Sequence, residues 1–284
     1  MPAIASDRLA ADIDGFGAQL VSLRHHRTGE LLWQGDRAIW PDHAPVLFPV
    51  VGRVRDDLLL VDGRPWPMLT HGVAKRADFA VTALAADQVR LALDGHDAFP
   101  FRFLLTLDYR AEGETLSVAM TIENREARRT MPANFGFHPG FAWPLPGASG
   151  KAGHAITFAE SEDVGIRRLT SERLVAPHDG ERFTGRVLPL SDDLFVPSAM
   201  MHAGLRSRSV LFSGPTETRV TVDFPDFPVL ALWMRGGGDF LCIEPWRALP
   251  QGEDYVGDYA DQPGIALIPP GGSLTARMRI TVSA

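Results

Sequence analysis

Cysteine is nearly absent from this 284-residue chain, and long apolar segments are missing altogether. Because Cys242 is the single cysteine, an intramolecular disulfide and a cysteine-rich zinc site are both excluded. The longest apolar runs, such as Val46–Val51 and Val229–Met234, are far shorter than the roughly 20 residues of a membrane-spanning helix. The N-terminal 14 residues carry three aspartates where a signal peptide needs positive charge followed by an apolar run. We therefore expect a cytoplasmic protein.

Basic residues are also fewer than acidic ones. The chain has 28 Lys+Arg against 35 Asp+Glu, a formal net charge of −7, and no block of basic residues. Such a chain is a poor ligand for nucleic acid or for an anionic membrane surface, so neither is expected as a partner. Nucleotide-binding glycine loops, the nucleophile elbow of serine hydrolases and helical metal-binding motifs are absent as well. We expect neither a metal nor another cofactor.

What the sequence does contain is a pattern of short strands. Apolar residues alternate through Phe101–Tyr109 and again through Leu116–Ile122, which predicts a β-hairpin around the turn AEGET. The 27 Gly and 22 Pro are spread along the whole chain and would break most long helices. We therefore predict an all-β protein, a single antiparallel domain over residues 1–284 built from two packed sheets. Further strands are expected at Val89–Leu93, Val210–Phe212, Val220–Phe224, Val229–Met234, Phe240–Glu244 and Ala276–Val282.

Three titratable residues lie in apolar or aromatic surroundings and are candidates for acid–base chemistry. His138 follows NFGF and precedes PGFAW, Glu244 lies within FLCIEPW, and His71 follows PMLT. A carboxylate that loses hydration has a raised pKa and can act as a base near neutral pH, and a histidine needs little adjustment for that range.

Each candidate also has an ordinary structural interpretation. A lone histidine beside aromatics is more often a half-buried structural residue, and a glutamate before proline is more often a solvated residue at a strand end. Arg53 would usually pair with a surface carboxylate. Patterns alone predict a large β protein with one cleft rich in His, Glu and aromatic residues.

Several of these segments, taken in their order, resemble the aldose 1-epimerase (galactose mutarotase) family and, within it, the bacterial LacX-like branch. The similarity spans roughly residues 10 to 282, and it is weak between about 146 and 210. The segments that carry it are Leu31–Arg53, Met68–Phe79, Phe99–Phe103, Asn134–Leu145, Phe240–Trp246 and the closing GIALIPPGGSLTARMRI.

The resemblance implies a β-supersandwich and a cofactor-independent interconversion of the α and β anomers of an aldose. By motif position, Glu244 would be the general base that removes the proton from the C1 hydroxyl. His138 would be the general acid that protonates the ring oxygen. His71 would hydrogen-bond the sugar and stabilise the charge that develops as the ring opens.

The same resemblance implies a set of sugar contacts. Arg53 would hold hydroxyl groups at the edge of the cleft. Two positions depart from the family pattern: Ser198 replaces an acidic or amide residue, and Lys75 replaces a bidentate arginine with a point charge. His202, close to Ser198 in sequence, could compensate for it or could equally be a surface residue. The apolar face of a pyranose would pack against Phe137, Trp143 and Trp246.

Two other functions remain open at this point. A hexose-6-phosphate mutarotase would use Arg53, Lys75 and Arg76 to contact the phosphate. A carbohydrate-binding or sensing protein would keep the scaffold without using its acid–base pair, and a purely structural β-sandwich is the least favoured. The sequence predicts a small sugar as ligand, but it leaves open which sugar, and whether the chain is a monomer or a homodimer.

Overall fold

The computed structural model describes all 284 residues and is built almost entirely from β-strands. The helical segments are four 3-10 helices of three or four residues each, and none is long and apolar enough to span a membrane. The all-β prediction is therefore confirmed. The four helices are η1 (Arg55–Asp57), η2 (Ala74–Arg76), η3 (Asp192–Phe195) and η4 (Tyr259–Asp261).

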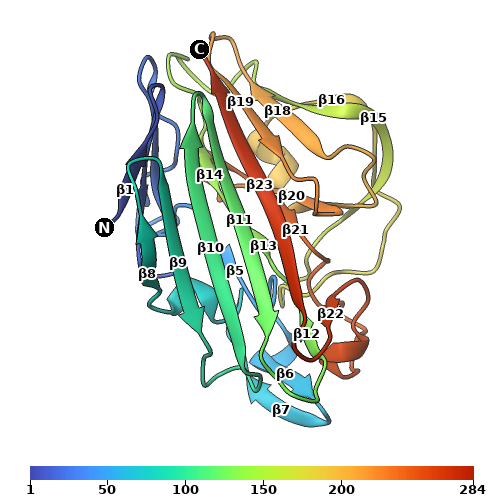
Figure 1. The fold of residues 1–284 in the computed structure, drawn as a ribbon. Coiled ribbons are helices and arrows are strands. Elements are labelled where there is room, and N and C mark those ends of the chain that lie inside the picture. The colour runs from blue at the N-terminus through green and yellow to red at the C-terminus, as the bar shows by residue number, and fades with distance from the viewer.

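Fifteen strands form one antiparallel sheet, the dominant element of the fold (Figure 1). The half that carries the candidate residues contains β5 (Val46–Leu47), β13 (Gly136–Phe137), β21 (Phe240–Trp246), β20 (Val229–Trp233) and β17 (Met200–Ala203), with β14 (Gly140–Ala142) also paired to β21. The other half contains β18 (Ser209–Ser213), β19 (Arg219–Asp223), β23 (Ser273–Ser283), β11 (Thr115–Asn124), β10 (Phe103–Glu112), β9 (Gln88–Asp94) and β8 (Ala80–Leu84). We call these the site half and the outer half.

A single strand, β15 (Ala155–Arg167), joins the two halves. Its first residues pair with β18 of the outer half, whereas Ile166 and Arg167 pair with β17 of the site half. The strand also pairs with β16 (Arg182–Pro189), and that ladder shifts register between Thr157 and Glu162. Irregularities of this kind bend a strand, which lets one sheet turn over on itself. The site half consequently lies behind the outer half in Figure 1.

The core lies between the two halves. In β10 and β11 buried and partly exposed residues alternate without interruption, as the hairpin prediction required. Glu112 pairs with Thr115, so the turn consists of Gly113 and Glu114, and Gly113 has a φ of 52° that favours glycine. Phe137 of the site half lines the same small internal cavity as Tyr109 and Met278 of the outer half.

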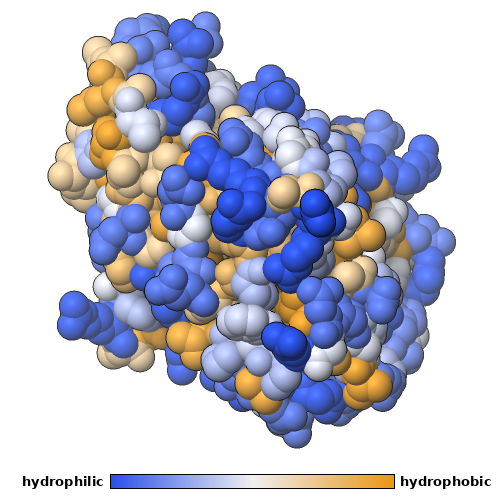
Figure 2. Space-filling view, turned by 60° about the horizontal axis from the view of Figure 1, so that its bottom comes forward, coloured by the Kyte–Doolittle hydropathy of each residue, from blue (hydrophilic) through white to orange (hydrophobic).

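Three smaller sheets complete the fold. The first is formed by β1 (Ala3–Ala5), β2 (Leu9–Ile13), β3 (Leu20–His25) and β4 (Gly29–Glu30); the others pair β6 (Leu58–Val61) with β7 (Arg64–Pro67) and β12 (Met131–Ala133) with β22 (Ala266–Ile268). Seen from the end at the bottom of Figure 1, the surface mixes hydrophilic residues with separate groups of hydrophobic ones (Figure 2).

Candidate active site

The register of the site half decides which side chains share a face. Glu244 of β21 pairs with Ala231 of β20, which pairs with Met201 of β17, which in turn pairs with Arg167 of β15. Directly paired residues point to the same side of a sheet, and so do residues two apart on one strand. Cys242 therefore lies on the same face as Glu244. We call this the catalytic face; its opposite face packs into the core.

A buried acid–base pair lies on the catalytic face. His138 occupies the short connection between β13 and β14, and its Nε2 lies 3.0 Å from Oε2 of Glu244. His138 is 6% exposed and Glu244 only 1%. Burial raises the pKa of Glu244, and the adjacent His138 opposes this shift. Glu244 is thus in the interior of a strand, not a solvated residue at its end.

Aromatic rings surround His138. The rings of Trp40 and Trp233 have their centroids 5.1 Å and 5.7 Å from that of His138. Gly140 permits the approach of Trp40, since a Cβ at Gly140 would lie only 2.6 Å from the indole. Trp233 is half-buried, and it pairs across the sheet with Cys242. The aromatic wall beside the acid–base pair is therefore made by Trp40 and Trp233.

His71 approaches His138 from another loop, with 5.4 Å between ring centroids. The backbone N–H of Gly52 donates to Nδ1 of His71, and the N–H of His71 donates back to the Gly52 carbonyl. Loss of hydration, together with the nearby His138 and Lys75, holds the pKa of His71 well below its ordinary value. His71 has a φ of 68°, in the left-handed region. The next residue, Gly72, cannot be replaced easily, because a Cβ there would lie 2.2 Å from the Phe48 carbonyl oxygen.

Both cations expected at the sugar are held by carboxylates. Lys75 Nζ lies 2.6 Å from Oδ2 of Asp42, and this pair is largely buried. Arg53 makes a bidentate contact, with Nε and Nη2 each 2.8 Å from an oxygen of Asp57. The surface ion pair considered for Arg53 is therefore present, and its guanidinium is not free at a cleft edge.

Two of the three expected aromatic contacts lie elsewhere. Phe137 is on the core side of β13 and packs against Phe227, with ring centroids 5.7 Å apart. Trp143 is fully buried beyond β14, where its indole N–H donates to the Lys151 carbonyl. Trp246 does share the catalytic face, two residues beyond Glu244, but it is 3% exposed.

Ser198 and His202 also occupy structural positions. The Ser198 hydroxyl accepts the backbone N–H of Leu169. His202 pairs with Leu230 on the core side of β17, is completely buried, and has a pKa lowered to about 4 by that burial. His202 therefore does not compensate for Ser198, because it faces away from Glu244.

The sequence reasoning missed three residues that lie next to the predicted pair, Trp40, Trp233 and Cys242, and a fourth, Asp42, that pairs with Lys75. Trp40 and Asp42 belong to the segment Leu31–Arg53, which carried the family resemblance, so their position in that motif was an available signal. Trp233 had no signal beyond its place in an apolar strand.

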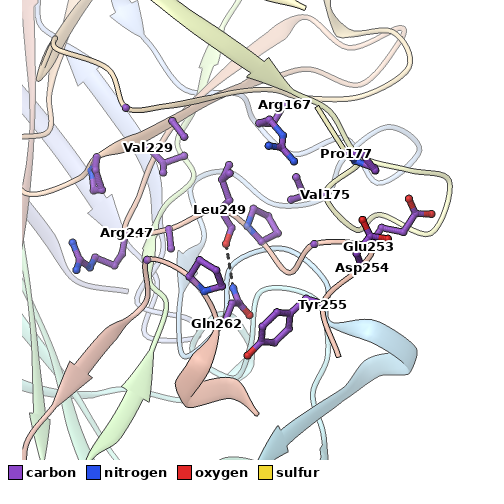
Figure 3. A pocket seen from close by; sticks show the side chains of 18 residues that line it. Arg167, Val175, Pro177, Val229, Arg247, Leu249, Glu253, Asp254, Tyr255 and Gln262 are labelled. Atoms are coloured by element: carbon purple, nitrogen blue, oxygen red, sulfur yellow. Dashed lines mark hydrogen bonds between the residues drawn. The ribbon is translucent and has the colours of Figure 1, made fainter. Parts of the chain in front are cut away.

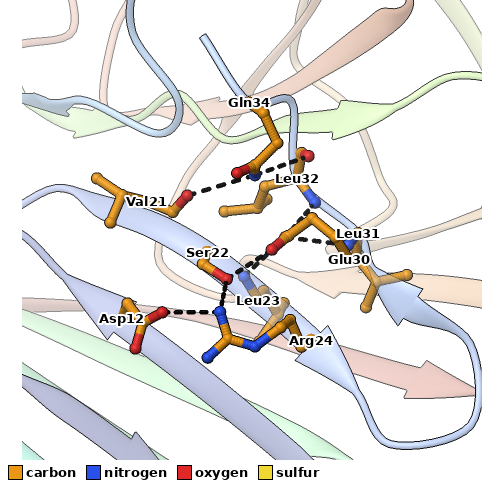
Figure 4. Close-up of polar contacts among 9 residues, drawn as sticks. All are labelled: Asp12, Val21, Ser22, Leu23, Arg24, Glu30, Leu31, Leu32 and Gln34. Carbon is orange, nitrogen blue, oxygen red and sulfur yellow. Dashed lines mark hydrogen bonds and ion pairs between the residues drawn. The ribbon is translucent and has the colours of Figure 1, made fainter.

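A polar network fixes the chain segment that leads to Trp40 (Figure 4). The carboxylate of Glu30 accepts the Ser22 hydroxyl at 2.5 Å and three backbone N–H groups, those of Leu23, Leu31 and Leu32. Immediately after this anchor, the Trp33 backbone N–H donates to the Gly140 carbonyl and the Trp33 indole N–H donates to the Trp40 carbonyl. Glu30 thereby holds in place the segment that packs on His138.

A cavity of about 640 Å³ lies farther along the catalytic face, around Val229 and Leu249 (Figure 3). Its lining does not include His138, Glu244 or His71. Arg167 points inward from one side in Figure 3, while Glu253 and Asp254 lie at the edge. Pro250 of its wall lies against Gly52, the residue that holds His71. The cavity is thus a neighbour of the His138–Glu244 pair and separate from it.

Comparison with known proteins identifies the family and the scaffold. The family model described as aldose 1-epimerase matches residues 3–281. The chain is 28% identical over 281 residues to the chromosomal protein LacX of Lactococcus lactis subsp. lactis, covering 94% of each. It superposes on a galactose mutarotase related enzyme from Lactobacillus acidophilus with a TM-score of 0.92 and 26% identity, over 99% of this chain and 97% of that one. A galactose mutarotase-like protein from Lactobacillus casei gives 0.90 and 26%, over 99% of both. The acid–base pair thus stands on a galactose mutarotase-like scaffold, and the chain belongs to the aldose 1-epimerase family.

Proposed function

We propose that the protein is an aldose 1-epimerase that interconverts the α and β anomers of a free hexose without a cofactor. One observation carries the proposal: Nε2 of His138 and Oε2 of Glu244 lie 3.0 Å apart, both buried, on one face of the site half. Family membership and the mutarotase-like scaffold support it.

Anomer exchange requires one proton to leave and another to arrive. Glu244 removes the proton from the C1 hydroxyl while His138 delivers a proton to the ring oxygen, so the C1–O5 bond breaks and a free aldehyde forms. Rotation about C1–C2 turns the other face of the aldehyde toward O5. His138 then takes the proton back from O5 as the ring recloses, and Glu244 returns its proton to the C1 oxygen. Both residues finish in their starting states.

The surrounding residues suit this sequence of steps. Because Gly52 donates to Nδ1, neutral His71 carries its proton on Nε2 and can donate to an oxygen of the sugar. In the sugar-free protein the His138–Glu244 contact is closed, so the C1 and ring oxygens must insert between the two side chains. Half-buried Trp233 offers a ring beside them for the apolar face of the pyranose.

A free sugar is favoured over a sugar phosphate. Arg53 and Lys75 are neutralised by Asp57 and Asp42. The third candidate, Arg76, donates Nη1 to two backbone carbonyls, those of Thr70 and Gly72. Two of the three cations that would contact a phosphate are thus already paired with carboxylates.

Polarimetry tests the proposal. Freshly dissolved α-D-glucose and α-D-galactose should reach rotational equilibrium faster with wild-type protein, and Glu244→Gln should lose at least about 10²-fold of that acceleration. Glu160→Gln makes the same chemical change at an exposed site and should keep it. Sugar binding without acceleration would reject the epimerase and identify a binding protein. Acceleration seen only with glucose 6-phosphate would identify a phosphosugar enzyme.

A further inference from the structure

Three metal-ligating side chains meet at the acid–base pair. A ring nitrogen of His138, Sγ of Cys242 and a carboxylate oxygen of Glu244 all lie within 4.8 Å of one another. All three residues are buried, with exposed fractions of 6%, 0% and 1%. Cys242 and Glu244 are two apart on β21, and His138 reaches them because β14 pairs with that strand. The epimerase steps use two of these groups and leave the thiol unused.

The donor set selects the kind of ion. One imidazole nitrogen, one thiolate and one carboxylate are the ligand types of zinc sites that have three protein ligands and an open fourth position. Calcium and magnesium prefer oxygen ligands only, so they do not suit this cluster. One atom of this group, His138 Nδ1, is buried without any hydrogen-bond partner. Such atoms are uncommon in folded proteins and mark a place where another partner can bind.

We propose that His138, Cys242 and Glu244 bind Zn²⁺ reversibly, and that the bound ion blocks epimerisation. The ion replaces the Cys242 proton and occupies lone pairs that His138 and Glu244 need for proton transfer. With metal–ligand distances of about 2.0–2.3 Å, the ligand atoms settle about 3.3–3.7 Å apart, so the 3.0 Å contact between Nε2 of His138 and Oε2 of Glu244 opens slightly as the ion enters. A sugar and the ion compete for the same place. The inhibition rests on the proposed function; the binding does not.

Metal binding is measured directly on the full-length, metal-free protein with Co²⁺ as the spectroscopic probe. Wild type should show a thiolate-to-cobalt charge-transfer band that Zn²⁺ abolishes by displacement. Cys242→Ser and Cys242→Ala should lose the band and bind Zn²⁺ at least roughly tenfold more weakly by calorimetry. His26→Gln, which removes an exposed histidine, should behave as wild type. Circular dichroism checks that each variant is folded.

The effect of Zn²⁺ on activity is measured with the same proteins. Zn²⁺ should slow anomer exchange by wild type and His26→Gln, and saturating galactose should weaken Zn²⁺ binding. A cobalt band that is missing in wild type, or unchanged in both Cys242 variants, would overturn the metal site. If the protein binds the metal but never accelerates anomer exchange, the metal site is supported and the proposed epimerase function is rejected. An active enzyme that binds Zn²⁺ without inhibition would reject the blocking role.

Discussion

The backbone N–H of Gly52 donates a hydrogen bond to Nδ1 of His71 at 3.1 Å. This contact fixes which nitrogen carries the proton in the neutral ring, and it points a single donor, Nε2–H, away from the loop. Since loss of hydration, together with nearby His138 and Lys75, disfavours a cation at His71, the residue stays a neutral donor at physiological pH. In the proposed mechanism His71 therefore orients and stabilises, whereas proton transfer falls to His138 and Glu244.

The pH dependence of catalysis should reflect this division. Because burial raises the pKa of Glu244, the base is lost by protonation at a higher pH than for an ordinary glutamate. We expect kcat/KM to fall on the acid side with a midpoint above 4.5, the ordinary value for Glu. His71→Asn should lower the rate without moving this midpoint, because the acid limb reports protonation of Glu244. If the midpoint moves in His71→Asn, the acid limb reports the protonation of His71 and not that of Glu244.

Glu244→Gln should stabilise the protein at neutral pH. A carboxyl whose pKa is raised on folding binds more protons in the native than in the unfolded state, so stability falls as pH rises through that interval. The variant has no charge to bury and avoids this loss. Its Tm at pH 7 should exceed wild type by roughly 3–5 °C for each pKa unit of the shift. Calorimetry should show that the Tm difference between variant and wild type shrinks toward pH 4. An equal Tm difference at pH 4 and pH 7 would contradict a raised pKa of Glu244.

Two aromatic substitutions should separate sugar contact from core packing. Trp233→Ala removes a half-buried ring beside His138 and should raise KM roughly tenfold, the effect of losing about 1.4 kcal/mol of binding. Phe137→Leu should lower Tm with little change in KM, because Phe137 packs against Phe227 in the core. Steady-state kinetics and thermal unfolding of both variants make the test. If KM rises only in Phe137→Leu, then Phe137 contacts the sugar and Trp233 does not.

Glu30 should matter for stability although it is distant from the chemistry. Its carboxylate accepts four hydrogen bonds that hold the segment leading to Trp33 and Trp40 (Figure 4). Glu30→Ala leaves backbone donors without partners and should cost about 2 kcal/mol, lowering Tm by roughly 4–8 °C. Glu160→Ala, at an exposed glutamate, should change stability by less than about 0.5 kcal/mol. Equal Tm values for the two variants would show that the network adds no stability.

The elements best predicted from sequence are those with a strong local pattern. The hairpin of β10 and β11 follows from ten-residue strands with uninterrupted alternation, where one face must be buried. The pairing of His138 with Glu244 depends on β14 lying beside β21, a contact between distant segments, and only the family resemblance indicated it.

The aromatic contacts were harder to predict for a geometric reason. Phe137 directly precedes His138, but it belongs to a two-residue strand, too short for alternation to reveal which side faces the core. Trp40 lies outside any strand and has no periodic pattern. Its position depends on tertiary contacts, above all the close approach at Gly140.

The most direct test of the central claim is anomeric exchange at equilibrium, measured by saturation transfer between the α and β C1 protons of galactose in NMR. Wild-type protein at catalytic concentration should transfer saturation, and Glu244→Gln and His138→Asn should each abolish most of the transfer. Glu160→Gln should leave it intact. Exchange at the wild-type rate in folded Glu244→Gln and His138→Asn would contradict the assignment of this pair as the catalytic acid and base.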